Sequence, residues 1–229
     1  MTKAIFWDFD GTLVHPNQSF FDSLKAALAE NKYNISDDEI WAVLKDACTW
    51  YNFDITYPDK TGEQWWVSFF EKFEPLFEKY QISSLNRENI KTRFRAQILG
   101  FDHYVLYDDA KSVLEACIRK GYKNYIISNN YPELADAIHH FGLEKYFTEC
   151  FVSANIGYEK PRKEIFQIAL EKAGYPEVCY MIGDNPVADV LGGKAAGMKT
   201  ILVHHEDRHE EDHNCKVLAE ILQLLEDSI

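Results

Sequence analysis

The N-terminal part of this 229-residue sequence has no apolar stretch long enough for a secretion signal or a membrane span, because Lys3 and Asp8 bracket only a few apolar residues. The sequence also lacks a basic cluster. Its 37 acidic and 24 basic residues give a formal net charge of −13, which would repel a phosphate backbone over most of the surface. We therefore expect a cytoplasmic protein that binds neither a membrane nor a nucleic acid polymer.

Cysteine is scarce as well. The five cysteines are odd in number, widely spaced and mostly in apolar surroundings, which favours reduced core thiols over disulfides or a zinc site. Internal repeats and low-complexity segments are also absent. A hydrophobic share of 46% is enough for one large domain, or for a core domain with a smaller one inserted.

Past about residue 106, strand-like and helix-like segments alternate. Predicted strands lie at 123–127, 150–153, 178–182 and 200–203. Predicted helices lie at 109–120, 132–141, 163–173, 186–196 and 217–225, and four of them end at a glycine: Gly121, Gly142, Gly174 and Gly197. Single helices between strands imply right-handed crossovers and a parallel sheet. With a first strand at 4–7, the sequence predicts a doubly wound, Rossmann-like α/β fold.

A long segment of different character separates the first strand from the others, and it is far longer than an ordinary loop. Its apolar residues recur at helical spacing, as in Phe69, Phe73 and Phe77. We therefore predict an α/β core formed by residues 1–15 and 99–229, with a helical bundle inserted at residues 16–98. Most of the many aromatic residues in the insertion should pack the bundle, while a few could line a pocket.

Polar residues fall at the carboxyl ends of the predicted strands, where open parallel sheets bind ligands. Asp8 and Asp10 occupy positions i and i+2 of an extended segment and so point the same way, and Gly11 lets the chain turn sharply. Later strand ends and helix starts supply further polar residues: Ser128, Asn129, Lys160, Asp184 and Asp189. Asn185 suits a helix N-cap, and helix N-termini favour a nearby anion.

Aspartates placed this close together require positive charge. Two carboxylates about 4 Å apart repel by about 4 kcal/mol at an effective dielectric constant near 20. Lys160 and a divalent cation are the evident sources of that charge. Because carboxylate oxygens without histidine or cysteine at ligand spacing favour Mg²⁺ over zinc, we predict Mg²⁺ as the cofactor.

These segments, in their chain order, resemble the four motifs of the haloacid dehalogenase superfamily, the aspartate-nucleophile phosphohydrolases. The first motif, Asp-x-Asp-Gly-Thr, is met by Asp8 through Thr12; the second and third are met by Ser128 and Lys160. The fourth, Gly-Asp with a later Asp, is met by Asp184 and Asp189. The helical insertion looks like the C1-type cap of subfamily I, which includes phosphoglycolate phosphatases, small nucleotidases and β-phosphoglucomutases.

The resemblance implies a phosphatase that works through an aspartyl-phosphate. Asp8 would attack phosphorus, and Asp10 would protonate the leaving oxygen and then take a proton from water. Mg²⁺ would be held by the Asp8 carboxylate, the Asp10 backbone carbonyl and Asp184.

The remaining motif residues receive supporting roles from the same resemblance. Ser128, the backbone amide of Asn129, and Lys160 would cradle the phosphoryl group. Asp189 would position Lys160 or a metal-bound water, while Gly11 and Thr12 complete the first motif.

Two other functions stay open. A sugar phosphomutase would return the phosphoryl group to a sugar, but the mutase branch has a histidine where this chain has Phe20. A non-catalytic regulatory or binding protein could use the same scaffold, although the intact Asp8 and Asp10 argue against it. Dehalogenation is disfavoured, because that branch lacks the second aspartate and the metal.

The expected substrate is a small phosphorylated metabolite. Trp50, Tyr51, Trp65 or Trp66 could stack on a base or ring, which suggests a nucleoside monophosphate, against small sugar or organic acid phosphates. His15, just beyond the first strand, could face the cap hinge and the substrate. The subfamily resemblance permits a monomer or a weak oligomer.

A histidine-rich stretch covers residues 204–213. His205, His209 and His213 recur at steps of four and could line one helical face as a transition-metal site. Because the stretch lies between a predicted strand and the last predicted helix, a solvated loop is the favoured interpretation.

Overall fold

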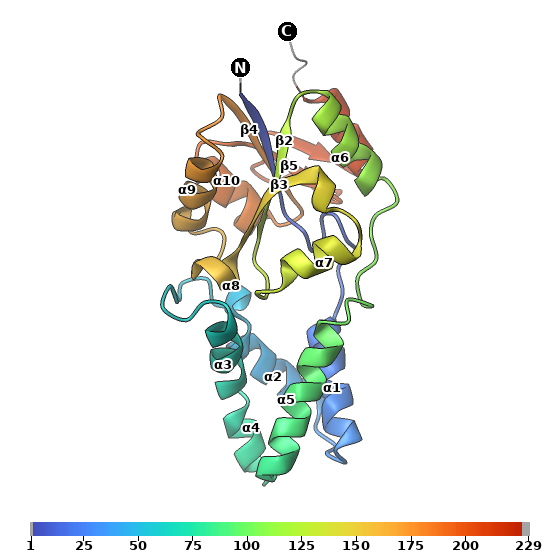
Figure 1. The fold of residues 1–229 in the computed structure, drawn as a ribbon, viewed down its shortest axis with the longest axis vertical. Coiled ribbons are helices and arrows are strands. Elements are labelled where there is room, and N and C mark those ends of the chain that lie inside the picture. The colour runs from blue at the N-terminus through green and yellow to red at the C-terminus, as the bar shows by residue number, and fades with distance from the viewer. Residues whose placement is uncertain (1, 226–229) are drawn as a thin grey trace.

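A six-stranded sheet forms the upper body of the molecule (Figure 1) in the computed structural model, which describes residues 2–225. The predicted core range 99–229 therefore extends slightly past the described residues. All strands are parallel, in the order β3-β2-β1-β4-β5-β6. The strands are β1 Lys3–Trp7, β2 Lys123–Ser128, β3 Phe147–Val152, β4 Val178–Gly183, β5 Lys199–Val203 and β6 His213–Cys215. The predicted doubly wound α/β fold is confirmed.

Both faces of the sheet are covered, which explains why its central strands β1 and β4 are mostly apolar. Along β1, Ile5 and Trp7 belong to one hydrophobic cluster, and Ala4 and Phe6 belong to a second. In Figure 1, α6 lies on one side of the sheet, and α9 and α10 lie on the other. The core helices are α6 Ala110–Arg119, α7 Leu134–His140, η2 Glu144–Tyr146, α8 Ser153–Ile156, α9 Lys163–Lys172, η3 Pro186–Leu191, α10 Gly192–Ala195 and η4 Leu218–Gln223. All five cysteines are free thiols, as predicted.

Three elements near the C-terminus differ from the prediction. The predicted loop at 204–213 ends in β6, which pairs with β5 and is too short to show a strand periodicity in the sequence. The predicted helix 186–196 is divided into the π-helix η3, in which the amide of Val190 reaches the carbonyl of Asn185, and the single turn α10. The predicted helix 217–225 is the 3₁₀ helix η4.

The insertion between β1 and β2 forms the lower body in Figure 1 and is helical, as predicted. Its core is aromatic: the ring of Phe69 lies 5.1–5.7 Å from the rings of Phe20, Trp65, Phe73 and Phe94. No helix among residues 2–225 is both long and apolar enough to cross a membrane. The insertion contains α1 Ser19–Glu30, α2 Asp37–Ala47, η1 Thr49–Tyr51, α3 Glu63–Glu71, α4 Glu74–Lys79 and α5 Ser84–Ile98.

The insertion docks on the core through backbone contacts at α8. The amide of Tyr57 donates to the carbonyl of Gly157, and the amide of Gly62 donates to the carbonyl of Ala154, each at 2.9 Å. Gly157 has a φ of +89°, and a Cβ there would lie 2.4 Å from Cα of Pro58. The docking of the insertion therefore depends on the absence of a side chain at Gly157.

Side chains form a second set of contacts between the insertion and the core. Arg95 of α5 lies 2.7 Å from Glu133 of the core, and the indole Nε1 of Trp66 donates to the same carboxylate at 2.9 Å. Together with the contacts at α8, this bridge keeps the insertion over the carboxyl ends of the strands, where the predicted site residues lie.

Candidate active site

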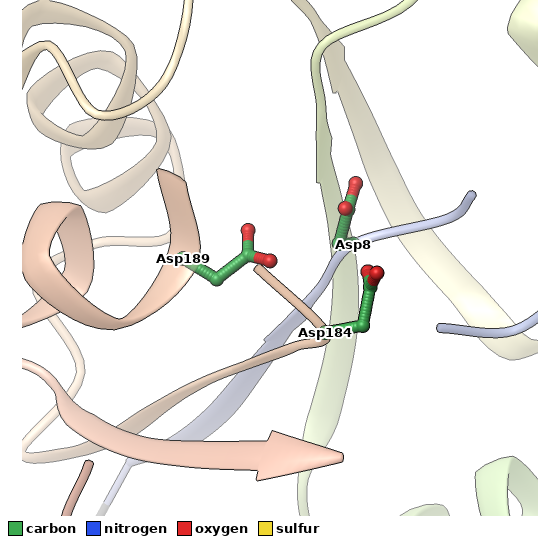
Figure 2. A group of neighbouring side chains, drawn as sticks. All are labelled: Asp8, Asp184 and Asp189. Atoms are coloured by element: carbon green, nitrogen blue, oxygen red, sulfur yellow. The ribbon is translucent and has the colours of Figure 1, made fainter. Parts of the chain in front are cut away.

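The polar ends of three strands meet at the carboxyl edge of the sheet. Asp8 follows β1, Ser128 ends β2, and Asp184 follows β4. Figure 2 shows the carboxylates of Asp8, Asp184 and Asp189 gathered there, and one oxygen of each lies within 4.8 Å of the others. The parallel topology thus brings together segments that are far apart in the sequence.

Lys160, from the loop before α9, supplies the positive charge of this cluster. Its Nζ lies 2.9 Å from Oδ1 of Asp8 and 2.6 Å from Oδ1 of Asp189. Burial lowers the pKa of Lys160, but Asp189 and Asp8 outweigh burial and raise the pKa overall, so the ammonium stays charged. The side chain of Asn129 fixes the backbone of this loop, because it donates to the carbonyl of Lys160 at 2.9 Å and accepts from its amide at 2.6 Å.

Asp189 lies against Lys160, with both carboxylate oxygens engaged. Oδ1 accepts from Lys160, and Oδ2 accepts from the backbone amide of Asn185 at 2.9 Å. Burial raises the pKa of Asp189, whereas the ammonium of Lys160 at 2.6 Å lowers it and favours the charged carboxylate. These contacts suit a positioning residue better than a metal ligand. Asn185 itself caps η3 as predicted, since its side chain accepts from the amides of Val187 and Ala188.

Asp184 is packed against the first motif. The hydroxyl of Thr12 donates to its Oδ1 at 3.0 Å. Gly11 has a φ of +75°, and a Cβ there would lie 2.3 Å from Oδ2 of Asp184. Burial, followed by repulsion from Asp8, raises the pKa of Asp184 to about 7. The absence of a side chain at Gly11 leaves room for the Asp184 carboxylate, and the hydroxyl of Thr12 holds it there.

Asp10 is held by two side-chain amides. Nδ2 of Asn130 donates to Oδ2 of Asp10 at 2.6 Å, and Nδ2 of Asn17 donates to Oδ1 at 3.4 Å. Burial, followed by repulsion from Asp8, raises the pKa of Asp10 to about 7 in spite of these bonds. A carboxyl group with a pKa near neutrality can both donate and accept a proton, as general acid–base catalysis requires. Sequence reasoning missed Asn130, although its position directly after Ser128 and Asn129 was an available signal.

The hydroxyl of Ser128 is a buried polar group at the end of β2. Its Oγ is buried and has no hydrogen-bond partner among the described residues. Buried hydroxyl groups normally have a partner, so this hydroxyl at the end of β2 is suited to a ligand oxygen.

The donor set fits a hard divalent cation. The ammonium of Lys160 contacts Asp8 and Asp189, and one oxygen of Asp184 lies within 4.8 Å of an oxygen of each of these aspartates. The raised pKa values of Asp10 and Asp184 reflect burial and mutual repulsion, which a cation would relieve. Asp8 and Asp184 offer carboxylate oxygens of the kind that Mg²⁺ binds.

A cavity of about 600 Å³ connects this cluster with the insertion. On the core side it is lined by polar residues that include Asp8, Asp10, Asn129, Lys160 and Asp184, and on the insertion side by aromatic and aliphatic residues. Trp50 and Tyr51 are among the latter, as the sequence suggested.

Three other residues predicted for substrate contact lie elsewhere. Trp65 and Trp66 are buried in the aromatic core of the insertion and do not line the cavity, because α3 turns both indoles inward. His15 does not line it either, because its ring packs at 3.9 Å on Tyr107. The structure thus places these three residues outside the lining of this cavity.

The histidine-rich stretch does not form the helical face that a metal site would need. Residues 204–212 contain no helix, and His213 belongs to β6. Among residues 2–225, one group of three or more histidine, cysteine or acidic side chains is close enough together to hold a metal ion. It consists of Asp8, Asp184 and Asp189.

Residues 2–197 match the family model described as haloacid dehalogenase-like hydrolase. The chain is 33% identical over 110 residues to a phosphoserine phosphatase of Thermus thermophilus and 39% identical over 106 residues to the pyrimidine 5'-nucleotidase YjjG of Escherichia coli. These alignments cover 47% and 44% of this chain, and the chain spans about half the length of each relative, 44% and 47%. A glyceraldehyde 3-phosphate phosphatase of Methanothermobacter thermautotrophicus is 28% identical over 240 residues, which is 99% of both chains.

Among solved structures, the fold is similar to that of YfnB, a putative HAD-hydrolase from Bacillus subtilis that was solved bound to magnesium. The two share 18% identity, with a TM-score of 0.72, over 97% of this chain and 98% of the other. At this identity the likeness concerns the fold.

Proposed function

Since the chain belongs to the haloacid dehalogenase-like hydrolase family, we propose that it is a Mg²⁺-dependent phosphatase that forms an aspartyl-phosphate on Asp8. The observation that supports this most directly is the contact of 2.9 Å between Asp8 and the buried ammonium of Lys160, with Asp10 nearby at a raised pKa. The substrate is a small phosphate monoester, either a nucleoside monophosphate or a small sugar or organic acid phosphate.

In the first step, a carboxylate oxygen of Asp8 forms a bond to phosphorus while the bond from phosphorus to the leaving oxygen breaks. Asp10 gives its proton to the leaving oxygen, so the product departs as an alcohol. Asn130 and Asn17 hold Asp10 in place for this transfer.

In the second step, Asp10, now a carboxylate, takes a proton from a water molecule whose oxygen attacks phosphorus. The bond between phosphorus and the Asp8 oxygen breaks, which releases inorganic phosphate and restores both aspartates. A residue that serves as acid and then as base must first carry a proton, and burial, which raises the pKa of Asp10, favours that protonated form.

The transferring phosphoryl group is cradled by the hydroxyl of Ser128, the backbone amide of Asn129 and the ammonium of Lys160. Asp189 keeps Lys160 in position. The Asp8 carboxylate, the Asp10 backbone carbonyl and Asp184 would hold Mg²⁺, which supplies positive charge against the phosphoryl oxygens when bound.

The test is an assay of the purified protein with Mg²⁺ against a panel of phosphomonoesters. We expect phosphate release that falls to background in Asp8→Asn and is unchanged in the exposed control Asp136→Asn. Acid quenching during turnover should leave one phosphoryl group on the peptide that contains Asp8. Undiminished activity of Asp8→Asn would exclude this nucleophile. Isomerisation of a sugar phosphate would favour a mutase, and the absence of both activities would favour a binding protein.

Metal binding has a separate readout. Mg²⁺ should raise the melting temperature of the wild-type protein, because a ligand that binds only the folded state stabilises it. Asp184→Asn should lose most of this rise, while Asp136→Asn should keep it.

A further inference from the structure

We propose that the cavity selects phosphate monoesters whose leaving group is uncharged and aromatic, and that it discriminates against leaving groups with a carboxylate. This inference rests on the proposed phosphatase activity and names its substrate class. Trp50, Tyr51 and Phe53 are the residues that we assign to this selection.

The first argument is the shape and lining of the cavity. Its volume of about 600 Å³ is in the range of sites that hold ligands much larger than a three-carbon phosphate. The insertion side consists mostly of apolar and aromatic side chains: Phe20, Trp41, Leu44, Trp50, Tyr51 and Phe53. A short polar leaving group would leave these side chains without contact.

The second argument is charge. Among the described residues that line the cavity, Lys160 is the sole cation, and it is 1% exposed and held by Asp8 and Asp189. The other charged lining residues are acidic: Asp8, Asp10 and Asp184. A second anionic group on the substrate would therefore meet repulsion with no counter-charge.

Two basic side chains of the insertion, Arg95 and Lys72, are engaged elsewhere. Arg95 pairs with Glu63 and Glu133, and Lys72 pairs with Asp46. None of these five residues lines the cavity. Asn185 lines the cavity as well; its side-chain oxygen caps η3, while its Nδ2 can donate a hydrogen bond to a neutral heteroaromatic group.

The third argument is that an aromatic platform is already in place. The indole of Trp50 is fixed by stacking on Trp65, with ring centroids 6.0 Å apart, and by an edge contact with Phe20 at 5.1 Å. Beside it, Tyr51 and Phe53 remain 52% and 37% exposed. A rigid indole flanked by exposed aromatic rings presents a surface on which a planar group can stack.

The test uses two pairs of substrates that differ in one feature. Uridine 5'-monophosphate and ribose 5-phosphate differ by the base, and glycerol 3-phosphate and 3-phosphoglycerate differ by the carboxylate. We expect kcat/KM to be about tenfold or more higher for the substrate with the base, in line with the usual strength of stacking on an aromatic side chain. We expect a similar preference for glycerol 3-phosphate over 3-phosphoglycerate.

Single substitutions test which cavity residues produce the two substrate preferences. Tyr51→Ala should reduce several-fold the ratio of kcat/KM for uridine 5'-monophosphate to kcat/KM for ribose 5-phosphate. Because Tyr51 is half exposed, this variant is not expected to disturb folding, whereas Trp50→Ala also removes packing against Trp65 and Phe20. Phe53→Lys should raise the relative rate on 3-phosphoglycerate. Ile55→Lys is its matched control, because Ile55 is 56% exposed on the same loop but does not line this cavity.

Binding separates this inference from the proposed function. Calorimetric titration of Asp8→Asn with the same four compounds measures selection without turnover. Tighter binding of the base-bearing member of one pair and the carboxylate-free member of the other supports the inference. It does so even if the wild-type protein hydrolyses none of the four compounds, and that lack of hydrolysis would overturn only the phosphatase proposal. Equal binding within each pair, or preference for 3-phosphoglycerate, would overturn the inference while leaving measured phosphatase activity intact.

Discussion

Lys160 and Asp189 form a fully buried ion pair, in which Nζ lies 2.6 Å from Oδ1 and each side chain is 1% exposed. Asp8 makes a second contact with the same ammonium at 2.9 Å. Asp8, the proposed nucleophile, and Asp189 thus share the ammonium of Lys160. A substitution of Asp189 should therefore change the position of Lys160 relative to Asp8.

Asp189→Asn should lower both the free energy of unfolding and the catalytic rate. Removal of one partner of a buried pair typically costs about 3 to 5 kcal/mol, and the retained contact with Asp8 places this case near the lower value. Urea unfolding and steady-state kinetics measure the two effects. Asp46→Asn, which breaks the exposed pair with Lys72, should cost about 1 kcal/mol or less. Equal losses in the two variants would contradict a special role for the buried pair.

Asp10→Asn should affect substrates according to their leaving groups. An alkyl phosphate needs a proton on its leaving oxygen, so its turnover should fall by about 10²- to 10⁴-fold. p-Nitrophenyl phosphate has a leaving group that departs without a proton, so the first step should remain fast and the second should become slow. Rapid-mixing kinetics should then show a burst of p-nitrophenol, and the absence of a burst with equal losses for both substrates would exclude Asp10 as the acid.

Gly157→Ala should displace the insertion from the core. The new Cβ would lie 2.4 Å from Cα of Pro58, so the docked loop must move, and KM should rise together with a loss of stability. Gly174→Ala is the matched control, because Gly174 also has a positive φ, +76°, but no atom lies within 4 Å of the added Cβ. The free energy of unfolding of Gly174→Ala should fall by about 1 to 2 kcal/mol through backbone strain, and its KM should stay unchanged. A raised KM in both variants would argue against the contact at α8.

His103 should make stability depend on pH. Burial lowers its pKa to about 4 against the opposing effect of Asp102, and its Nε2 is buried without a partner among the described residues. Between pH 6.5 and pH 4 the unfolded chain therefore binds a proton that the folded chain does not, so stability falls as the pH falls through that interval.

His103→Gln removes this proton uptake. Its melting temperature, relative to that of the wild-type protein, should be constant above pH 7 and should rise as the pH falls from 6.5 to 4. Scanning calorimetry across this range measures the difference. The exposed His139→Gln provides the comparison, and the same pH dependence in both variants would rule out burial of His103 as the cause.

Several features of the fold follow from local sequence patterns. The parallel sheet was predictable because its strands are short apolar segments separated by single helices, and four of those helices end at glycines that do adopt positive φ: Gly121, Gly142, Gly174 and Gly197. β6 was not predictable, since three residues carry no periodicity and their pairing depends on β5.

The sequence by itself determined the chemistry of the site. Asp8, Asp10, Ser128, Lys160 and Asp184 each stand at a strand end or helix start, and a parallel sheet places such ends at one edge. Their residue types therefore indicate a site for a cation and an anion before any distance is known.

The tertiary structure alone decided which neighbours complete the site and which aromatic residues face it. The bond from Asn130 to Asp10 and the buried pair of Lys160 with Asp189 join segments whose approach depends on packing. Trp50 lines the cavity, whereas Trp65 is enclosed in the insertion. The physical reason is that a helical pattern shows which residues are apolar, but the docking of one helix on another decides whether an apolar side chain meets the protein core or the substrate.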